Sequence, residues 1–202
     1  MSREKSIVFY IGSLCMGGAE RVIVNLAAYF RSCGYTVTIV TKLQDEDEYP
    51  VPDGVTRILA DITGNEISSN RIVNLYRRIA KLRNIFKQLS PDYIVSFIKK
   101  NNFMAITAAA GLRIPVIVSV RSNPAREYPD KVTRFLVRVL FERAAGVVLQ
   151  TQQAKGFFPK SVQKKAVVLP NSLSEKFLQN EYTGERRKEI VCSSRILRTT
   201  PS

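Results

Sequence analysis

The chain has 202 residues and a formal net charge of +14, from 31 lysines and arginines against 17 acidic residues. It contains no histidine, which removes the parts for an imidazole base, a Ser-His-Asp triad or a histidine-ligated zinc site. Hydrophobic residues make up 45%, as in ordinary folded domains, and three cysteines without metal-ligand spacing favour a reducing compartment. A balance this basic predicts an anionic partner: phosphate groups, an anionic membrane surface or nucleic acid.

No apolar run approaches the ~20 residues that a membrane-spanning helix needs. The N-terminus also lacks the long apolar core and the cleavage site of a signal peptide. We therefore expect a cytoplasmic protein that is at most peripheral at the inner face of the plasma membrane.

Short β-branched, apolar runs alternate with helix-like stretches along the chain. The run 115–120 is almost continuously apolar, which indicates a strand buried on both faces. This alternation predicts an α/β fold: a Rossmann-like, doubly wound, mostly parallel sheet with helices on both faces. Strands are expected at 6–11, 36–41, 55–60, 93–97, 115–120, 146–150 and 166–169. Helices are expected at 18–32, 70–89, 101–111, 130–144 and 152–157, with a further short one at 174–179.

Ligands of such sheets bind at the carboxyl ends of the strands. The loops of interest therefore follow Ile11, Thr41, Phe97, Val120 and Gln150.

The first expected strand runs through a glycine turn into a helix. Gly17 and Gly18 follow the strand, and apolar residues then recur with a helical period from Val22. Glycines let backbone N–H groups approach a ligand closely, and the helix N-terminus adds partial positive charge. The pattern predicts an anion cradle, most often for phosphate, although glycines in such a turn can also be purely structural.

Two expected helices combine an apolar stripe with a basic face. In 70–89 the stripe includes Ile72 and Tyr76, and in 130–144 it includes Val132, Phe135 and Val139. Such helices either expose a solvated basic face above the core or contact anionic lipid headgroups. The aromatic residues lie on apolar stripes and are expected in the core, which argues against a nucleic-acid surface. The basic faces consist of Arg71, Arg78 and Lys81 in the first helix, and of Lys131, Arg134 and Arg138 in the second.

Five stretches in the expected order resemble the N-terminal domain of family 4 glycosyltransferases. These are retaining enzymes of the GT-B fold, which include bacterial capsule and exopolysaccharide sugar transferases. The resemblance covers nearly all of residues 5–192. The stretches are Gly17–Val22, Val118–Pro124, Arg143–Thr151, Phe157–Lys160 and Val167–Ser172.

The resemblance implies that residues 1–185 form the acceptor-side Rossmann-like domain. Residues 186–202 would be the linker and the truncated start of the donor domain, including an unpaired strand at 189–193, so the donor domain is expected to be missing. The sequence leaves open whether the chain is a fragment, an engineered piece or a frameshifted product. The full-length enzyme would transfer a sugar, with retention, from a nucleotide sugar to a lipid-linked or oligosaccharide acceptor in bacterial polysaccharide biosynthesis. We expect this chain alone to be inactive.

The resemblance also implies roles for individual residues. Gly17 and Gly18 match the glycine loop that lies near the donor diphosphate. Arg121 and Asn123 are the expected catalytic residues, stabilising charge on the leaving diphosphate, because the histidine that other branches place nearby is absent. Val120 stands where the exopolysaccharide group has a glutamate. No metal or other cofactor is expected. The expected acceptor-binding residues are Glu20, Arg21, Arg126 and Lys131.

Two other functions compete with a transferase. A dinucleotide oxidoreductase would need G-x-G-x-x-G and an acidic residue after the second strand, where this chain has Thr41-Lys42. A nonenzymatic basic module that binds a membrane or another polyanion stays open.

Overall fold

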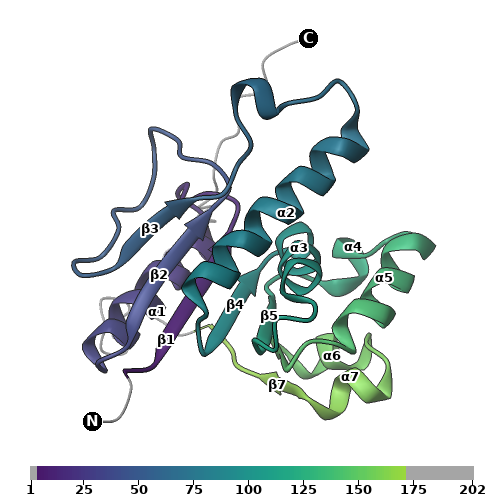
Figure 1. Ribbon diagram of the computed structural model, residues 1–202. Coiled ribbons are helices and arrows are strands. Elements are labelled where there is room, and N and C mark those ends of the chain that lie inside the picture. Colours follow the sequence, from purple (N-terminus) through teal and green to yellow (C-terminus); the bar gives the residue numbers. More distant parts are fainter. Residues whose placement is uncertain (1–3, 172–202) are drawn as a thin grey trace, which may run out of the picture. The chain divides into compact units, whose positions relative to one another are not determined.

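All strands of the sheet run in the same direction. The computed structural model describes residues 4–171, and their seven strands pair in parallel in the order β3-β2-β1-β4-β5-β6-β7 (Figure 1). The strand order reverses between β1 and β4, which are neighbours although far apart in sequence. The strands are β1 (Ser6–Ile11), β2 (Thr36–Thr41), β3 (Thr56–Leu59), β4 (Tyr93–Phe97), β5 (Val116–Val120), β6 (Gly146–Leu149) and β7 (Ala166–Val168).

Helices cover both faces of this sheet. α1 (Gly18–Ser32) packs on one face through Ile23 and Ala27. α2 (Arg71–Leu89), α3 (Lys99–Ala109) and α5 (Lys131–Phe141) pack on the other. The short elements are η1 (Gly64–Glu66), α4 (Pro124–Glu127), α6 (Gln152–Gly156) and α7 (Lys160–Lys164).

These elements confirm the predicted fold class and the seven predicted strands. The predicted helices at 18–32, 70–89, 101–111, 130–144 and 152–157 also form, with shifts of up to three residues at their ends. The sequence patterns missed α4 and α7, because four or five residues are too few to show a helical period. The predicted helix at 174–179, the strand at 189–193 and the domain boundary after residue 185 lie outside the described residues.

One aromatic cluster fixes the segment between β5 and α5. The Tyr128 side chain is fully buried, and its ring centroid lies 6.0 to 6.3 Å from those of four phenylalanines. Burial and the neighbouring Glu127 carboxylate raise the pKa of Tyr128 far above its usual value, so its hydroxyl stays protonated. The four phenylalanines are Phe103, Phe141, Phe157 and Phe158.

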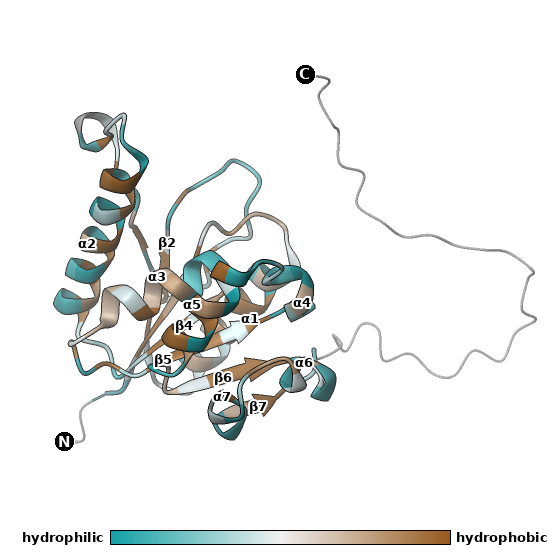
Figure 2. Cartoon of the chain, turned by 90° about the vertical axis from the view of Figure 1, so that its right-hand side faces the viewer, coloured by the Kyte–Doolittle hydropathy of each residue, from teal (hydrophilic) through white to brown (hydrophobic). Residues whose placement is uncertain are grey.

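Several apolar residues expected in the core are exposed instead. Tyr76 on α2 is 72% exposed and Phe135 on α5 is 63% exposed, so the expectation of buried aromatics is wrong at these positions. α5 lies at the end of the helical layer with α3 as its main helix neighbour, and it buries Val137 and Phe141. Figure 2 shows the resulting mixture of hydrophobic and hydrophilic residues along α2 and α5.

None of the helices within residues 4–171 combines the length and apolarity needed to cross a bilayer.

A shielded ion pair holds the loop that follows β1. The Glu48 carboxylate accepts hydrogen bonds from Arg57 Nη1 at 2.5 Å and from the Leu14 backbone N–H at 3.0 Å. The two side chains are only 7% and 14% exposed. The Arg57 guanidinium, reinforced by backbone N–H groups, lowers the pKa of Glu48 from 4.5 to about 2. The pair therefore ties the glycine turn to β3.

We predict that Glu48→Gln lowers the free energy of unfolding at pH 7 by about 2 to 3 kcal/mol, because Arg57 loses its charged partner. The depressed pKa means that the wild-type advantage is complete above pH 4.5 and is lost as the pH falls toward about 2. Urea unfolding of both proteins between pH 7 and pH 3 measures this difference. Glu46→Gln, an exposed change in the same loop, should have no comparable effect; a pH-independent gap between Glu48→Gln and wild type would contradict the assignment.

Candidate functional site

The carboxyl ends of β1, β4, β5 and β6 meet at a hollow of about 440 Å³, here named the central hollow. It lies where the strand order reverses, which is the usual ligand position in open parallel sheets. Four of the five loops named from the sequence, those after Ile11, Phe97, Val120 and Gln150, border this hollow, whereas the loop after Thr41 does not. The hollow is lined by Gly18, Ala19, Glu20, Ile98, Arg121, Ser122, Glu127, Gln150 and Asn171.

The glycine turn contributes the open N-terminus of α1. Gly17 is the N-cap residue, and no side chain of residues 4–171 caps this helix end. Gly18 is exposed, has no left-handed φ, and an added Cβ would meet nothing within 4 Å. Neither conformation nor packing against the described residues therefore requires glycine at position 18. Glycine at position 18 is explained by a ligand that must approach the backbone closely.

Glu20 lies in the first turn of α1 and folds back toward Gly17. An added Cβ on Gly17 would collide with the Glu20 carboxylate. A carboxylate in this place is stabilised by the positive end of the helix dipole. A diphosphate bound at the same N–H groups would have to displace it, so Glu20 and the expected diphosphate site compete for one helix end.

Arg121 follows β5 and lines the central hollow. Its guanidinium carbon lies 5.9 Å from the centroid of the Phe97 ring, and its Nη2 donates a hydrogen bond to Asn171 Oδ1. Burial lowers the pKa of Arg121, but an arginine remains charged at neutral pH. The hollow thus holds one positive group at the position predicted from the sequence.

The segment after β4 is strained. Ile98 has φ 74° and ψ 142°, a conformation that β-branched residues rarely adopt. It precedes α3, whose Lys99 ammonium donates to the Glu127 carbonyl at 2.8 Å and lies 5.9 Å from the centroid of the Tyr128 ring. This turn therefore joins β4 to the α4 segment directly beside the hollow.

Glu127 is a candidate site residue that the sequence analysis missed. Its carboxylate accepts hydrogen bonds from the Ser122 hydroxyl and, at 3.3 Å, from the Tyr128 hydroxyl. Both donors are neutral, and Lys99 binds the Glu127 backbone rather than its side chain. The carboxylate is therefore oriented in the hollow, and no ion pair within residues 4–171 neutralises it. A single glutamate in a polar loop has no sequence pattern that distinguishes it.

Residues 17–172 match a family described as the glycosyl transferase 4-like domain. The match covers more than half of the 202 residues. The chain belongs to this family.

A relative from Campylobacter jejuni shares 28% identity with this glycosyl transferase 4-like domain over 163 residues, which are 81% of this chain and 45% of that protein. Its name is GalNAc-alpha-(1->4)-GalNAc-alpha-(1->3)-diNAcBac-PP-undecaprenol alpha-1,4-N-acetyl-D-galactosaminyltransferase.

Solved structures of the GT-B fold resemble the chain in their architecture. Sucrose-phosphate synthase from Thermosynechococcus elongatus gives a TM-score of 0.63 at 14% identity, over 86% of this chain and 49% of that chain. HepE from Anabaena, solved with UDP and glucose, gives 0.63 at 16% identity, over 84% of this chain and 45% of that chain. The chain spans less than half the length of each of these relatives.

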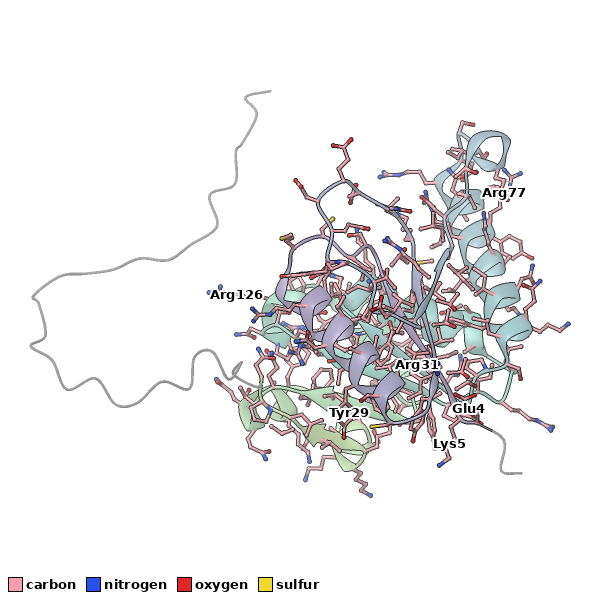
Figure 3. All side chains as sticks on the ribbon, turned by 90° about the vertical axis from the view of Figure 1, so that its left-hand side faces the viewer. Glu4, Lys5, Tyr29, Arg31, Arg77 and Arg126 are labelled. Atoms are coloured by element: carbon pink, nitrogen blue, oxygen red, sulfur yellow. The ribbon has the colours of Figure 1, made fainter. Side chains whose placement is uncertain are left out.

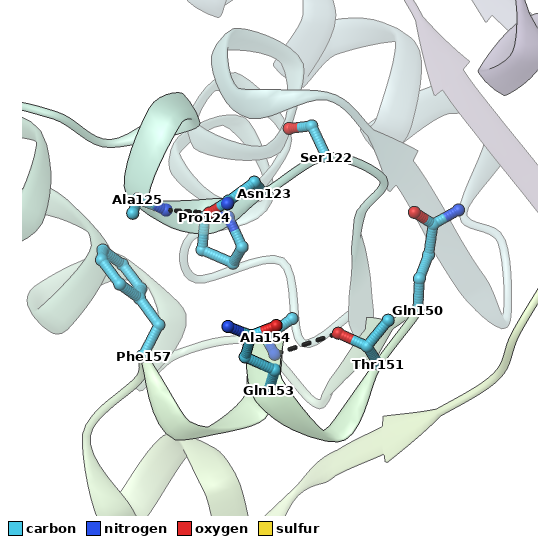
Figure 4. A pocket seen from close by; sticks show the side chains of 9 residues that line it. All are labelled: Ser122, Asn123, Pro124, Ala125, Gln150, Thr151, Gln153, Ala154 and Phe157. Atoms are coloured by element: carbon cyan, nitrogen blue, oxygen red, sulfur yellow. Dashed lines mark hydrogen bonds between the residues drawn. The ribbon is translucent and has the colours of Figure 1, made fainter.

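Five predicted site residues of this glycosyl transferase 4-like domain do not line the central hollow, and one of them, Gly17, is the N-cap of α1 directly before the lining residue Gly18. The Asn123 side chain caps α4 by accepting from the Ala125 N–H and borders a second hollow (Figure 4). Arg126 and Lys131 are exposed on α4 and α5, and Arg21 is exposed on α1. Figure 3 shows Arg126 at the opposite side of the view from Arg77 of α2.

A group of potential metal ligands lies outside the central hollow. Cys15 Sγ, Asp45 and Glu48 have ligand atoms within 4.8 Å of one another. The Glu48 carboxylate is already bound by Arg57 and by the Leu14 N–H. A metal ion here would have to break the ion pair that holds the glycine turn.

We predict that Ile98→Gly is more stable than Ile98→Ala by about 1 kcal/mol, because glycine adopts a left-handed φ without strain. At Lys100, in the first turn of α3, the alanine variant should be more stable than the glycine variant, because alanine favours a helix. Urea unfolding of the four variants measures both differences. Alanine as the more stable residue at position 98 would show that the turn is unstrained.

Proposed function

We propose that this chain is the acceptor-binding half of a retaining glycosyltransferase. The complete enzyme transfers a sugar from a nucleotide sugar to a lipid-linked glycan in bacterial polysaccharide biosynthesis. The observation that carries the proposal is the central hollow, which combines Glu20, Glu127 and Arg121 at the point where the strand order reverses. The diphosphate-undecaprenol acceptor in the name of the Campylobacter relative and the UDP bound to HepE support it.

In this proposal the carboxylates and the guanidinium have separate tasks. Sugar hydroxyls donate hydrogen bonds to Glu20 and Glu127, which hold the attacking oxygen in place. The bond between the donor sugar and its diphosphate breaks, and Arg121 stabilises the negative charge that stays on the diphosphate. Backbone N–H groups at Gly18 add to this stabilisation without a metal ion. In the complete enzyme, this half holds the acceptor while the sugar is transferred.

The surface of α5 supports contact with an anionic membrane. Val132, Phe135 and Val139 are 67%, 63% and 38% exposed on this helix. Lys131 and Arg138 flank them and make no hydrogen bond or ion pair within residues 4–171. We name these five residues the α5 patch. Exposed apolar side chains beside unpaired basic ones match the interface between lipid headgroups and acyl chains.

α2, the other basic helix, is a weaker membrane candidate. Arg78 forms an ion pair with Asp61 at 2.9 Å, and Lys81 forms one with Glu66 at 3.2 Å. Two of the three basic side chains expected to face lipid are therefore neutralised within the domain.

We predict that Glu127→Gln weakens binding of a farnesyl-diphosphate-linked N-acetylgalactosamine disaccharide by about tenfold, because hydrogen bonds to a charged group are lost. Isothermal titration calorimetry on the full chain measures the affinity. Glu142→Gln is the matched control, since the Glu142 carboxylate also accepts from a serine, Ser161, but lies outside the central hollow. Equal affinities of Glu127→Gln and wild type would remove Glu127 from the site, and no binding by the wild type would contradict the acceptor function.

We predict that Phe135→Ser lowers co-sedimentation with phosphatidylglycerol vesicles by about tenfold, because the exposed ring no longer inserts below the headgroups. Tyr29→Ser serves as the control: Tyr29 is also an exposed aromatic residue, 62% exposed, but lies on α1 across the sheet (Figure 3). Pure phosphatidylcholine vesicles should bind the wild type weakly. Retention of Phe135→Ser at the wild-type level would exclude the α5 patch as the docking surface.

A further inference from the structure

A second hollow, of about 470 Å³, adjoins the central one and is here named the outer hollow (Figure 4). None of its lining residues carries a charge, although the chain has 31 lysines and arginines. It shares Ser122 and Gln150 with the central hollow, so a ligand can extend from one into the other. Its polar groups are the amides of Asn123, Gln150 and Gln153 and the hydroxyls of Ser122 and Thr151.

Several of these polar groups remain available to a ligand. Asn123 Oδ1 accepts from the Ala125 N–H at 3.0 Å, which leaves the amide NH₂ of Asn123 free to donate. Thr151 Oγ1 accepts from the Ala154 N–H at 3.1 Å and keeps its own hydrogen as a donor. The Gln150 and Gln153 side chains have no hydrogen-bond partner within residues 4–171. Amides both donate and accept, as sugar hydroxyls do.

The wall of the outer hollow includes the ring of Phe157. That ring is stacked at 26° against Tyr128, with the centroids 6.2 Å apart, and the Arg134 guanidinium carbon lies 5.7 Å from its centroid. Phe157 is thus held in one orientation by its neighbours. A rigid aromatic surface beside amides suits a ligand with an apolar C–H face and a rim of hydroxyls.

We propose that the outer hollow binds the second sugar of the acceptor, so that the acceptor is a neutral oligosaccharide end rather than a single sugar. This inference rests on the acceptor function proposed above. A phosphate or an acidic sugar would leave its charge unpaired in this hollow, whereas a neutral sugar finds a partner for its hydroxyls. The terminal sugar occupies the central hollow beside Glu127, and the preceding sugar lies between Gln153 and Phe157.

Nuclear magnetic resonance on the ¹⁵N-labelled full chain tests this assignment. The probes are neutral methyl glycosides of hexoses and N-acetylhexosamines, each disaccharide paired with its own non-reducing-end monosaccharide. Disaccharides should shift the Gln153 side-chain amide resonances, whereas monosaccharides should shift only the backbone around Gly18 and Glu127. Gln153→Ala should raise the disaccharide Kd about fivefold, the loss of one neutral hydrogen bond, and leave monosaccharide binding unchanged. Gln152→Ala is the matched control, because this neighbouring glutamine on α6 does not line the outer hollow.

The outcomes separate the inference from the proposed function. Disaccharides that shift Gly18 and Glu127 but not Gln153, or that bind Gln153→Ala as tightly as wild type, would overturn the second-sugar site and leave the acceptor function intact. Absence of any shift with every sugar would overturn both.

Discussion

Seven parallel strands place all of their carboxyl ends at one edge of the sheet, and the candidate site depends on this constraint. Gly18, Ile98, Arg121 and Gln150 follow four different strands and are separated by up to 132 positions in the chain, yet they line one hollow. An antiparallel strand among these four would carry its loop to the far edge. The reversal of strand order between β1 and β4 adds the space, because the connections on its two sides diverge and leave the edge uncovered.

Loops at such an edge need anchors, and this domain supplies them from buried groups. The Glu48–Arg57 pair ties the turn after β1 to β3, and Tyr128 fixes the segment after β5 within its aromatic cluster. Tyr128 also donates to the Glu127 carboxylate, so one buried ring connects the core to the central hollow. The strain at Ile98 is tolerated because α3 and β4 on its two sides are both well packed.

Much of this arrangement could be predicted from sequence because it is periodic. Continuous β-branched runs identified the strands, and their order placed Gly18, Glu20 and Arg121 at one edge. Glu127 escaped because its role depends on Tyr128 and Ser122, contacts that no spacing reveals. The sequence alone does not distinguish a catalytic Asn123 from one that caps a helix. In the structure its side-chain Oδ1 caps α4. The stripe on α5 was recognised as apolar, but its exposure follows from the position of α5 at the end of the helical layer, which requires the three-dimensional packing.

The distribution of charge indicates that different parts of the surface attract the domain to a membrane and discriminate between glycans. The net charge of +14 is not concentrated in the hollows: the outer hollow is neutral, and the central one contains two carboxylates against one guanidinium. Unpaired basic groups lie instead at surfaces such as the α5 patch, next to exposed apolar side chains. Long-range attraction needs only the net field, whereas discrimination between glycans needs hydrogen bonds at fixed positions. On the proposed function, the basic surface therefore brings the domain to an anionic membrane, and the uncharged groups of the hollows decide which glycan end is held there.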